Sequence, residues 1–358
     1  MPDSLSPEFW RNKRVLLTGH TGFKGAWMSI WLNHLGADVS GIALPANTKP
    51  SVFVEARIDD LINTFYDDIR NYERIQEIVN QVCPEIVIHL AAQSLVRPSY
   101  TDPVTTYATN VLGTVHLLDA VRRYGKTKVF LNVTSDKCYE NLETNRPYKE
   151  DDQLGGHDPY SNSKACSEML TKAFRDSYFR ENEDSMALAS ARAGNVIGGG
   201  DWSEDRLMPD CIRSFFENKK LLIRNPDATR PWQHVLEPLS GYITLVEKMF
   251  DDNLSYSEAW NFGPVNSEVK PVRYIVDKLT SDLDNHHWDV HMGNHPHEAK
   301  MLSVDVSKAK KRLGWKPFLN LDETLNWTTD WYKRYYQGEN AFDLTIEQVS
   351  NYMEKNSK

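Results

Sequence analysis

The stretch that decides the fold lies close to the N-terminus and reads Val15-Leu16-Leu17-Thr18-Gly19-His20-Thr21-Gly22-Phe23-Lys24-Gly25. Its apolar beginning is typical of a buried parallel strand, and the periodic residues from Ala26 to Leu35 predict a helix that Gly36 ends. The glycines at positions 19, 22 and 25 allow a tight turn and let a pyrophosphate approach the helix N-terminus. This strand, turn and helix together predict a dinucleotide-binding site.

Short apolar strands and helices alternate outward from this turn, which predicts an α/β fold with a doubly wound parallel sheet of the Rossmann type. The predicted strands cover 38–44, 84–93 and 129–133, with another ending at 66–70, and the predicted helices cover 72–82, 102–124 and 160–180. After residue 192 the elements become shorter, so we expect a smaller, mixed α/β C-terminal substrate domain. The predicted boundaries are 1–191 for the nucleotide-binding domain, 192–340 for the substrate domain, with some chain crossing back, and 341–358 for a polar tail.

The composition argues against several classes of partner. The chain has 41 basic and 50 acidic residues, a net charge of −9 and no long basic run, so we do not expect nucleic acid as its main partner. No apolar run approaches the length of a membrane span, and the beginning lacks the features of a signal peptide. We therefore expect no membrane partner. The four cysteines show no CxxC spacing, so we expect reduced thiols and a cytoplasmic location.

A second group of polar residues follows the apolar run 129–133, at the carboxyl end of a predicted strand, where ligands collect in open sheets. It begins with Ser135-Asp136-Lys137, and Tyr160 and Lys164 follow, four positions apart at the start of a predicted helix. That spacing puts both side chains on one helix face. A lysine ammonium near a phenol favours the phenolate, so we expect a lowered pKa that lets Tyr160 take a proton from an alcohol. An isolated pair of this kind is usually an ordinary feature of a helix surface, so its meaning depends on the other motifs.

Other conspicuous residues have ordinary structural interpretations. Trp27 and Trp31 lie four apart on an amphipathic helix and are expected in the core. Cys138 is expected to fill apolar space rather than to act as a nucleophile. Five histidines fall between positions 286 and 297, but without neighbouring cysteines or clear ligand spacing they do not predict a metal site.

Taken together, the motifs resemble the extended short-chain dehydrogenase/reductase family, in the family's order and over almost the whole chain. The residues that carry this resemblance are Thr18-Gly-x-x-Gly22-x-x-Gly25, Asp68-Ile69, Ala91-Ala92, Asn110, Ser135 and Tyr160-x-x-x-Lys164. Further stretches are similar to the nucleotide-sugar dehydratases of that family that act on CDP-hexoses. They are 89–100, 134–139, 230–235 and 297–300.

The resemblance implies a retained NAD cofactor and CDP-glucose as the substrate. The residues that it places at the cofactor are Gly19, His20, Gly22, Phe23, Lys24, Gly25, Asp68, Ile69, Leu90, Ala91, Ala92, Asn110, Tyr160 and Lys164. Those that it places at the substrate are Gln93, Ser94, Asn195, Arg206, Leu207, Arg230, His234, Asn261 and His297. Asp68 and the two asparagines Asn195 and Asn261 also suit ordinary turns. Arg230 and His234 also suit a solvated loop, although a diphosphate needs cations somewhere.

The reaction implied by the resemblance is a 4,6-dehydration. NAD takes hydride from C4 of the sugar while Tyr160, assisted by Lys164 and Ser135, takes the proton of the 4-hydroxyl. The ketone then acidifies the C5 proton, water is lost across C5 and C6, and hydride returns to C6. Asp136 matches the family acid that protonates the leaving hydroxyl, whereas Lys137 replaces a glutamate, so the identity of the C5 base stays open.

Two other functions fit parts of this pattern. A nucleotide-sugar 4-epimerase or ketoreductase shares the fold, the cofactor and the Tyr/Lys pair, but it has no need of an acid and a base at Asp136 and Lys137. A catalytically silent NAD-sensing protein would usually have lost the Tyr/Lys pair, which this chain keeps.

One departure from the family concerns the cofactor. The acidic residue that usually binds the adenosine ribose is missing near Ala43 and Leu44, so we expect weakened NAD retention, with NADP, through Lys49 and Arg57, as a minor alternative. The resemblance further implies a homodimer, or a tetramer, built through a four-helix bundle of the helices at 102–124 and 160–180. It also implies a product that feeds the deoxyhexoses of O-antigen lipopolysaccharide or a related surface polysaccharide.

Overall fold

A parallel sheet forms the centre of the chain. The computed structural model describes residues 6–143, 146–180, 185–217, 220–264, 269–282, 288–290 and 302–356. Within these ranges the sheet has seven strands in the order β3-β2-β1-β4-β5-β6-β11, all parallel. The strands are β1 (Arg14–Thr18), β2 (Asp38–Ala43), β3 (Asn63–Tyr66), β4 (Ile86–His89), β5 (Val129–Val133), β6 (Ala187–Ala193) and β11 (Ala259–Phe262). This arrangement confirms the predicted doubly wound Rossmann-type fold.

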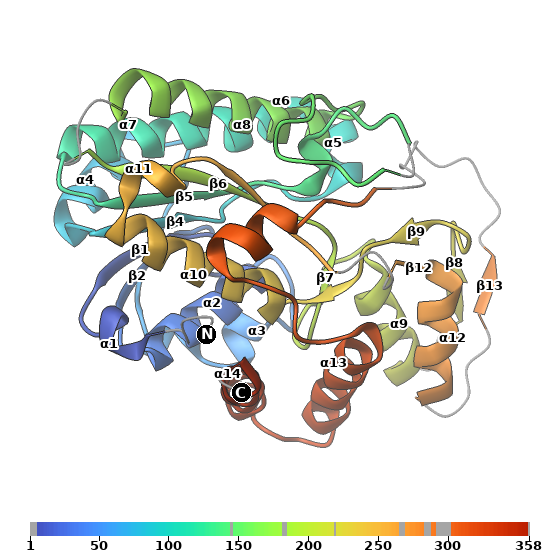
Figure 1. Cartoon of the computed structure of the whole chain (residues 1–358). Coiled ribbons are helices and arrows are strands. Elements are labelled where there is room, and N and C mark those ends of the chain that lie inside the picture. The colour runs from blue at the N-terminus through green and yellow to red at the C-terminus, as the bar shows by residue number, and fades with distance from the viewer. Residues whose placement is uncertain are drawn as a thin grey trace.

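Helices cover both faces of the sheet (Figure 1). One face carries α4 (Tyr72–Val82), α7 (Thr114–Tyr124) and α8 (Pro159–Tyr178), with α5 (Val96–Thr101) and α6 (Pro103–Tyr107) at one end. The other face carries α2 (Phe23–His34) and α10 (Leu236–Asp251), with the short helices α1 (Pro7–Trp10) and α3 (Val52–Glu55) beside them. Because both faces are covered, β4 and β5 are buried at every position, which is why their sequences are apolar runs.

The predicted core residues are buried. Trp27 and Trp31 on α2 and Cys138 after β5 are each 0% exposed, which confirms these three predictions. The indole nitrogen of Trp27 still donates a hydrogen bond of 2.9 Å to the carbonyl of Gly199, so this bulky side chain is buried with its polar atom satisfied. Nowhere in the described ranges does a helix combine the length and the apolar character needed to cross a bilayer.

The helix predicted at 102–124 is divided by a wider turn. It begins as α6, passes through the π-helical segment η2 (Ala108–Gly113) and continues as α7. Gly113 at the end of η2 packs against Ile69, because a Cβ added there would lie 2.7 Å from Ile69 Cδ1. π-turns inside helices frequently occur at functional sites. Here the turn lies beside the loop after β4.

The C-terminal part of the chain forms a smaller, mixed α/β region to one side of the sheet (Figure 1). Its two-stranded sheets pair β7 (Val196–Ile197) with β10 (Gln233–His234), β9 (Thr229–Arg230) with β12 (Lys270–Pro271), and β8 (Leu221–Ile223) with β13 (Trp288–Val290). Its helices are α9 (Leu207–Phe216), α12 (Val272–Asp282) and α13 (Leu321–Tyr336). The remaining short elements are η1 (Ile58–Asp60), η3 (Asp136–Cys138), α11 (Asn253–Tyr256) and η5 (Ala309–Leu313). Although α10 and β11 fall within 192–340, they pack in the main sheet unit, so the chain crosses back there.

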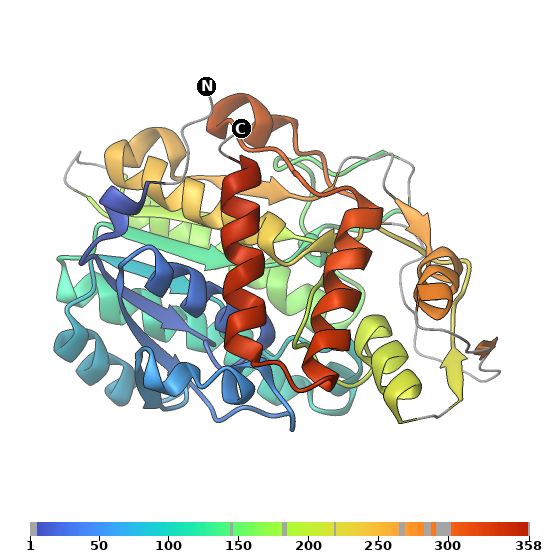
Figure 2. The same cartoon turned by 90° about the horizontal axis from the view of Figure 1, so that it is seen from below.

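The end of the chain differs from the prediction. The polar tail expected at 341–358 is instead the helix α14 (Ala341–Asn356), which packs against α2 (Figure 2). Its buried residues include Leu344, Val349 and Tyr352, and they recur with helical spacing. Thr345 and Gln348 are buried as well, whereas the other polar residues of the helix are exposed or partly exposed. The large number of polar residues concealed the apolar stripe in the sequence.

Candidate active site

The carboxyl ends of the central strands open into one large cavity. It has a volume of about 640 Å³ and extends from the turn after β1 to α9 and β8 of the smaller region. Strand β1 lies between β2 and β4, so the connections leave the sheet in opposite directions at this point. Ligands of open α/β sheets bind in the crevice that such a switch point creates.

The glycine turn after β1 is shaped for a close approach of backbone and ligand. Gly19 has a left-handed φ of +76°, and a Cβ on it would lie 2.7 Å from the backbone nitrogen of Ala91. A Cβ on Gly25 would lie 2.1 Å from the carbonyl oxygen of Gly19. Among the described residues no side chain caps the N-terminus of α2 at Gly22, so its first N–H groups are available to an anion. The turn therefore fits the pyrophosphate of a dinucleotide.

Hydrogen bonds hold this turn against the end of β4. The hydroxyl oxygen of Thr18 lies 2.6 Å from Nδ1 of His89 and accepts hydrogen bonds from the backbone nitrogens of Leu90 and Ala91, at 3.2 and 3.1 Å. Leu90, Ala91 and Ala92 thereby form one wall of the cavity. The small side chains of Ala91 and Ala92 let a ligand lie close to the backbone there.

Asp68 and Ile69 lie at the end of the cavity beside β2. One Asp68 oxygen accepts from the backbone nitrogen of Arg70 and the other from Arg70 Nε, both at 2.9 Å. These bonds with Arg70 lower the pKa of Asp68, so the carboxylate is charged near neutral pH. Ala43 and Leu44, which line the same region, supply no acidic side chain.

The five residues predicted to be catalytic line the same cavity: Ser135, Asp136, Lys137, Tyr160 and Lys164. Ser135 caps η3: its hydroxyl accepts from the backbone nitrogen of Lys137 at 3.2 Å and donates to Asp136 Oδ1 at 3.1 Å. Lys164 donates from Nζ to the carbonyl of Val133 at 3.4 Å, and Lys137 Nζ lies 6.0 Å from the ring centre of Tyr160. The end of β5 and the start of α8 therefore bring these groups together.

Burial controls the protonation of these groups. It raises the pKa of Tyr160 to about 12, although a hydrogen bond with Ser135 acts in the opposite direction. The lowered pKa expected for Tyr160 is therefore not found in the chain alone, because desolvation outweighs the hydrogen bond with Ser135 and the charge of Arg206. Burial also lowers the pKa of Lys164 to about 8 and raises the pKa of Asp136, with Lys137 partly opposing the latter shift.

Cationic side chains gather in the part of the cavity that faces the smaller region. Arg206 donates to Asp201 Oδ2 at 3.0 Å and to the Ser94 hydroxyl at 3.4 Å, and Arg230 lies nearby on the wall. Lys24 at the start of α2 is buried, which lowers its pKa to about 8. These positive groups suit a diphosphate.

Three residues at the rim of the cavity were not assigned from the sequence. Arg97 and Arg224 both donate to Asp205 Oδ1, at 3.2 and 3.1 Å, and all three line the cavity. The Arg97 bond joins α5 to the smaller region. Arg97 and Asp205 are 108 positions apart in the chain, and no local sequence signal reports such a contact.

Four residues predicted to contact ligands have side chains that lie in the interior and not on the cavity wall: His20, Asn110, His234 and Asn261. His20 packs against Gly41 and the ring of Phe53. Asn110 binds both backbone groups of Gln93, at 2.8 and 2.9 Å. His234 accepts from the backbone nitrogen of Leu236, and Asn261 accepts from the Tyr139 hydroxyl.

The other predicted contacts lie on the cavity wall, namely Gly19, Gly22, Phe23, Lys24, Gly25, Gln93, Ser94, Asn195, Arg206, Leu207 and Arg230. His297 falls outside the described residues, as do the other histidines between 286 and 297. Within the described ranges no group of His, Cys, Asp and Glu side chains is arranged to hold a metal ion.

Comparison with known proteins identifies the family. The sequence model described as GDP-mannose 4,6 dehydratase matches residues 16–328. The chain belongs to this dehydratase family. It is 49% identical over 353 residues to a CDP-glucose 4,6-dehydratase of Salmonella typhimurium, and the match covers 98% of each chain. That similarity confirms the resemblance to the dehydratases that act on CDP-hexoses. A dTDP-glucose 4,6-dehydratase of the same organism is 25% identical, covering 94% of this chain and 98% of the relative.

Solved structures share the fold of this dehydratase family member. UDP-glucose 4-epimerase of Thermotoga maritima, solved with UDP-glucose, aligns with a TM-score of 0.77 over 90% of this chain and 99% of its own, at 22% identity. dTDP-glucose 4,6-dehydratase of Bacillus anthracis, solved with NAD, aligns with a TM-score of 0.76 over 92% and 99%, at 23% identity. At this level of identity, epimerase and dehydratase are equally similar in fold, so the choice between them depends on the side chains.

Proposed function

We propose that this chain dehydrates CDP-glucose to CDP-4-dehydro-6-deoxyglucose with NAD as its resident cofactor. The observation that carries the proposal is the shared cavity wall of the Tyr160/Lys164 pair and the Asp136/Lys137 pair. A dehydration needs both an oxidation site and an acid with a base for elimination, whereas an epimerase needs the first alone. The 49% identity to a CDP-glucose 4,6-dehydratase supports the same choice.

The cavity wall offers contacts for the pyrophosphate, the adenosine end and the length of NAD, but no acidic side chain at Ala43 or Leu44 for the adenosine ribose. The glycine turn and the N-terminus of α2 would hold the pyrophosphate, Asp68 and Ile69 would lie at the adenosine end, and Ala91 and Ala92 would lie along the dinucleotide. When bound, NAD accepts hydride from C4 of the sugar and returns it to C6.

Tyr160 takes the proton of the sugar 4-hydroxyl as C4 is oxidised. Its phenol has a high pKa in the chain alone, so it needs stabilisation as the phenolate. Ser135 provides a hydrogen bond and Arg206 provides positive charge, and we propose that the Lys164 ammonium and the positive nicotinamide ring add to that charge.

Asp136 protonates the 6-hydroxyl as it leaves, and Lys137 is the base for the C5 proton. Burial raises the pKa of Asp136, which favours the protonated carboxyl that an acid catalyst requires. Lys137 follows it directly on η3 and is partly buried, with Nζ within 6.0 Å of the Tyr160 ring centre. The elimination pair therefore lies beside the group that handles the 4-hydroxyl.

The diphosphate of the substrate binds to the cationic part of the cavity. Arg206, directly before α9, and Arg230 on β9 line this part of the cavity, and Leu207 follows Arg206 in the chain. A guanidinium can make two parallel hydrogen bonds with a phosphate, which suits these positions.

The test is incubation of the purified protein with CDP-glucose and NAD, followed by analysis for a 4-keto-6-deoxy sugar nucleotide. We expect this product, and a kcat/KM for CDP-glucose well above those for dTDP-glucose and UDP-glucose. Formation of a C4 epimer in place of the keto sugar would identify an epimerase. Binding of NAD with no turnover of any sugar would identify a silent NAD-binding protein.

Assembly and cellular role are also part of the proposal. The helices at 102–124 and 160–180 form a homodimer through a four-helix bundle, with a tetramer as the alternative. The cysteines Cys83, Cys138, Cys166 and Cys211 are free thiols, which suits work in the cytoplasm. The product supplies deoxyhexoses to O-antigen or a related surface polysaccharide.

A further inference from the structure

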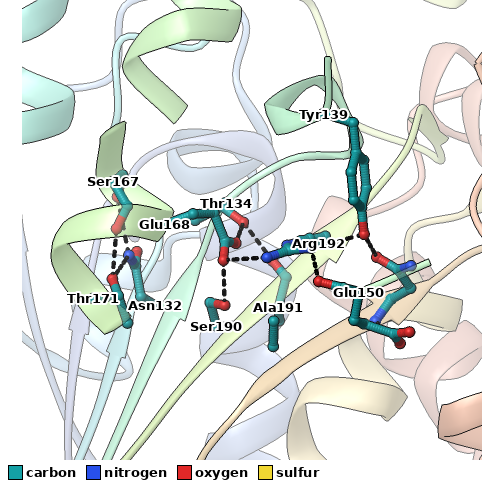
Figure 3. A network of polar contacts seen from close by, with 12 residues as sticks. Asn132, Thr134, Tyr139, Glu150, Ser167, Glu168, Thr171, Ser190, Ala191 and Arg192 are labelled. Carbon is teal, nitrogen blue, oxygen red and sulfur yellow. Dashed lines mark hydrogen bonds and ion pairs between the residues drawn. The ribbon is translucent and has the colours of Figure 1, made fainter. Parts of the chain in front are cut away.

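A buried ion pair lies directly behind the predicted catalytic residues. Arg192 on β6 donates from Nη2 to Glu168 Oε2 on α8 at 2.8 Å, and the side chains are 4% and 3% exposed. Figure 3 shows this pair at the centre of a polar network between β5, β6 and α8. Ser190 also donates to Glu168 Oε2, at 2.7 Å, and Arg192 Nη1 donates to the Tyr139 hydroxyl at 2.8 Å.

Glu168 is linked to the active site by two routes. Its Oε1 accepts a hydrogen bond from Thr134, the residue directly before Ser135. It also lies four positions after Lys164 on α8, and both side chains are buried. Lys164 Nζ binds the carbonyl of Val133 while Glu168 binds Thr134, so the two side chains meet consecutive residues at the end of β5.

Stability alone is a weak explanation for this pair. The free energy needed to desolvate two buried charges is about as large as the free energy of their attraction. Apolar replacements of a buried ion pair are therefore often neutral or stabilising. Here the carboxylate is nevertheless fully surrounded by donors, namely Thr134, Ser190 and Arg192. These donors lower the pKa of Glu168 in spite of its burial, so it keeps its negative charge.

The charges around Lys164 come from four elements. Glu168 on α8 favours the ammonium form, and so does the thiol of Cys138 on η3 when ionised, although burial raises the pKa of that thiol well above its usual range. Lys24 on α2 and His89 on β4 lie near enough to interact with the ammonium, but the pKa of His89 is lowered to about 3, so it is neutral. Glu168 is therefore the permanent negative charge that opposes the burial of Lys164.

We propose that Glu168 is a positioning residue for the oxidation step: its buried carboxylate keeps Lys164 in the ammonium form, and Arg192 limits the strength of that effect. The inference rests on the proposed function, because it concerns the lysine that stabilises the Tyr160 phenolate. Glu168 itself is not on the cavity wall, and it acts through two residues that are, Lys164 and Thr134.

The first test is the pH profile of C4 oxidation, followed in single turnover by the near-ultraviolet absorbance of reduced nicotinamide. Activity should fall on the alkaline side as Lys164 loses its proton. Glu168→Gln keeps the shape and removes the charge, so we expect this alkaline limb to move to lower pH by on the order of one unit. Arg192→Met leaves the carboxylate uncompensated and should move the limb to higher pH.

Matched variants distinguish this role from a structural one. Glu247→Gln removes a partly buried carboxylate elsewhere, on α10 beside α1, and should leave the limb unchanged. The double variant Glu168→Gln/Arg192→Met removes both charges and so buries no unpaired charge. We expect the alkaline limb of its pH profile to move to lower pH, as in Glu168→Gln, but by less. A lower plateau with an unmoved limb in Glu168→Gln and in the double variant would overturn the proposal.

A second measurement needs no turnover. In the folded chain the pKa of Lys164 is about 8, against 10.5 as its usual value, so unfolding binds a proton between these pH values and stability rises with pH across them. In Glu168→Gln this rise should begin at lower pH than in the wild type, as measured by denaturant unfolding from pH 7 to 10 without added cofactor. An unchanged onset in Glu168→Gln would contradict the role given to Glu168. If the onset shifts but the protein does not convert CDP-glucose, the effect of Glu168 on Lys164 holds and the proposed function is refuted.

Discussion

At the residue scale, Tyr160 and Lys137 divide the reaction between them. Replacing Lys137 by Met keeps the length of the side chain and removes the amine, so C4 oxidation should continue while removal of the C5 proton fails. We expect reduced nicotinamide to accumulate, visible at its near-ultraviolet absorbance, with product formation slower by about 10²–10⁴-fold, the usual contribution of a positioned acid or base.

Tyr160→Phe is the matched variant for this prediction. It removes the group that takes the 4-hydroxyl proton, so no reduced nicotinamide should form. In D₂O the wild type should place solvent deuterium at C5 of the product. Normal turnover by Lys137→Met, or a product without deuterium at C5, would show that Lys137 is not the base.

The end of the cavity beside β2 leads to a prediction about cofactor retention. A carboxylate that accepts hydrogen bonds from the ribose contributes about 1.5–3 kcal/mol, and neither Ala43 nor Leu44 can supply it. We therefore expect a fraction of the purified protein to lack NAD and its activity to rise on addition of NAD. Measurement of bound nucleotide after purification, compared with activity before and after addition, provides the test. A full complement of NAD with no response to more would show that other contacts replace the missing carboxylate.

The sequence predicted the parts of this site that are continuous in the chain. The glycine turn and the pairs Asp136/Lys137 and Tyr160/Lys164 each lie within a short stretch, and the structure brings them to one cavity. The direction in which a single side chain points was harder to predict from the sequence. His20 lies inside the glycine turn, yet its ring points into the core against Phe53. The bridge from Arg97 through Asp205 to Arg224 depends on tertiary packing, so no local pattern could reveal it.

At the element scale, the strands with nearly continuous apolar sequences were predicted correctly. A helix whose apolar residues are separated by polar residues was missed. β4 and β5 are buried at every position and apolar apart from His89 and Asn132, and their assignment is confirmed. In α14 the apolar residues recur with helical spacing, but polar residues between them suggested a tail. The π-turn η2 follows from contacts such as that of Gly113 with Ile69, which sequence periodicity does not report.

The attachment of α1 makes stability depend on pH. Glu247 accepts hydrogen bonds from the Trp10 indole at 2.7 Å and from the backbone nitrogen of Ser6 at 3.2 Å. Burial raises its pKa from the usual 4.5 to about 7. The folded chain therefore binds more protons than the unfolded chain between these values, so this contribution to stability is fully present below pH 4.5 and is lost as the pH rises through 7.

We expect Glu247→Gln to flatten this dependence. The amide keeps an oxygen that can accept from Trp10 and has no proton to lose in this range. The loss of unfolding free energy between pH 5 and 8 should be smaller in the variant than in the wild type by on the order of 1–2 kcal/mol. Urea unfolding at a series of pH values measures it. Burial raises the pKa of Glu237 to about 7 as well, so some slope should remain, and an unchanged slope would mean that Glu247 does not titrate as described.

At the scale of the whole molecule, one face of the sheet carries helices with exposed apolar side chains. Val104 on α6 is 77% exposed, Leu112 on η2 49% and Met169 on α8 53%. These helices lie together on the outer side of that face (Figure 1). Large apolar side chains gathered on neighbouring helices mark interaction surfaces, and a second copy of the same helix pair would complete a bundle of four.

This surface gives the prediction for the oligomer. Leu112→Glu and Val104→Glu would each place a charge in the centre of a symmetric contact, so the change occurs twice per dimer and like charges are brought together. We expect the wild type to sediment as a dimer or larger and the double variant to sediment as a monomer that keeps its far-ultraviolet circular dichroism. Val54→Glu is the control, because Val54 is 54% exposed on α3, on the other side of the sheet, and its replacement should leave the assembly intact. A wild type that sediments as a monomer would show that there is no stable subunit contact. A double variant that stays a dimer would show that the contact lies on another surface.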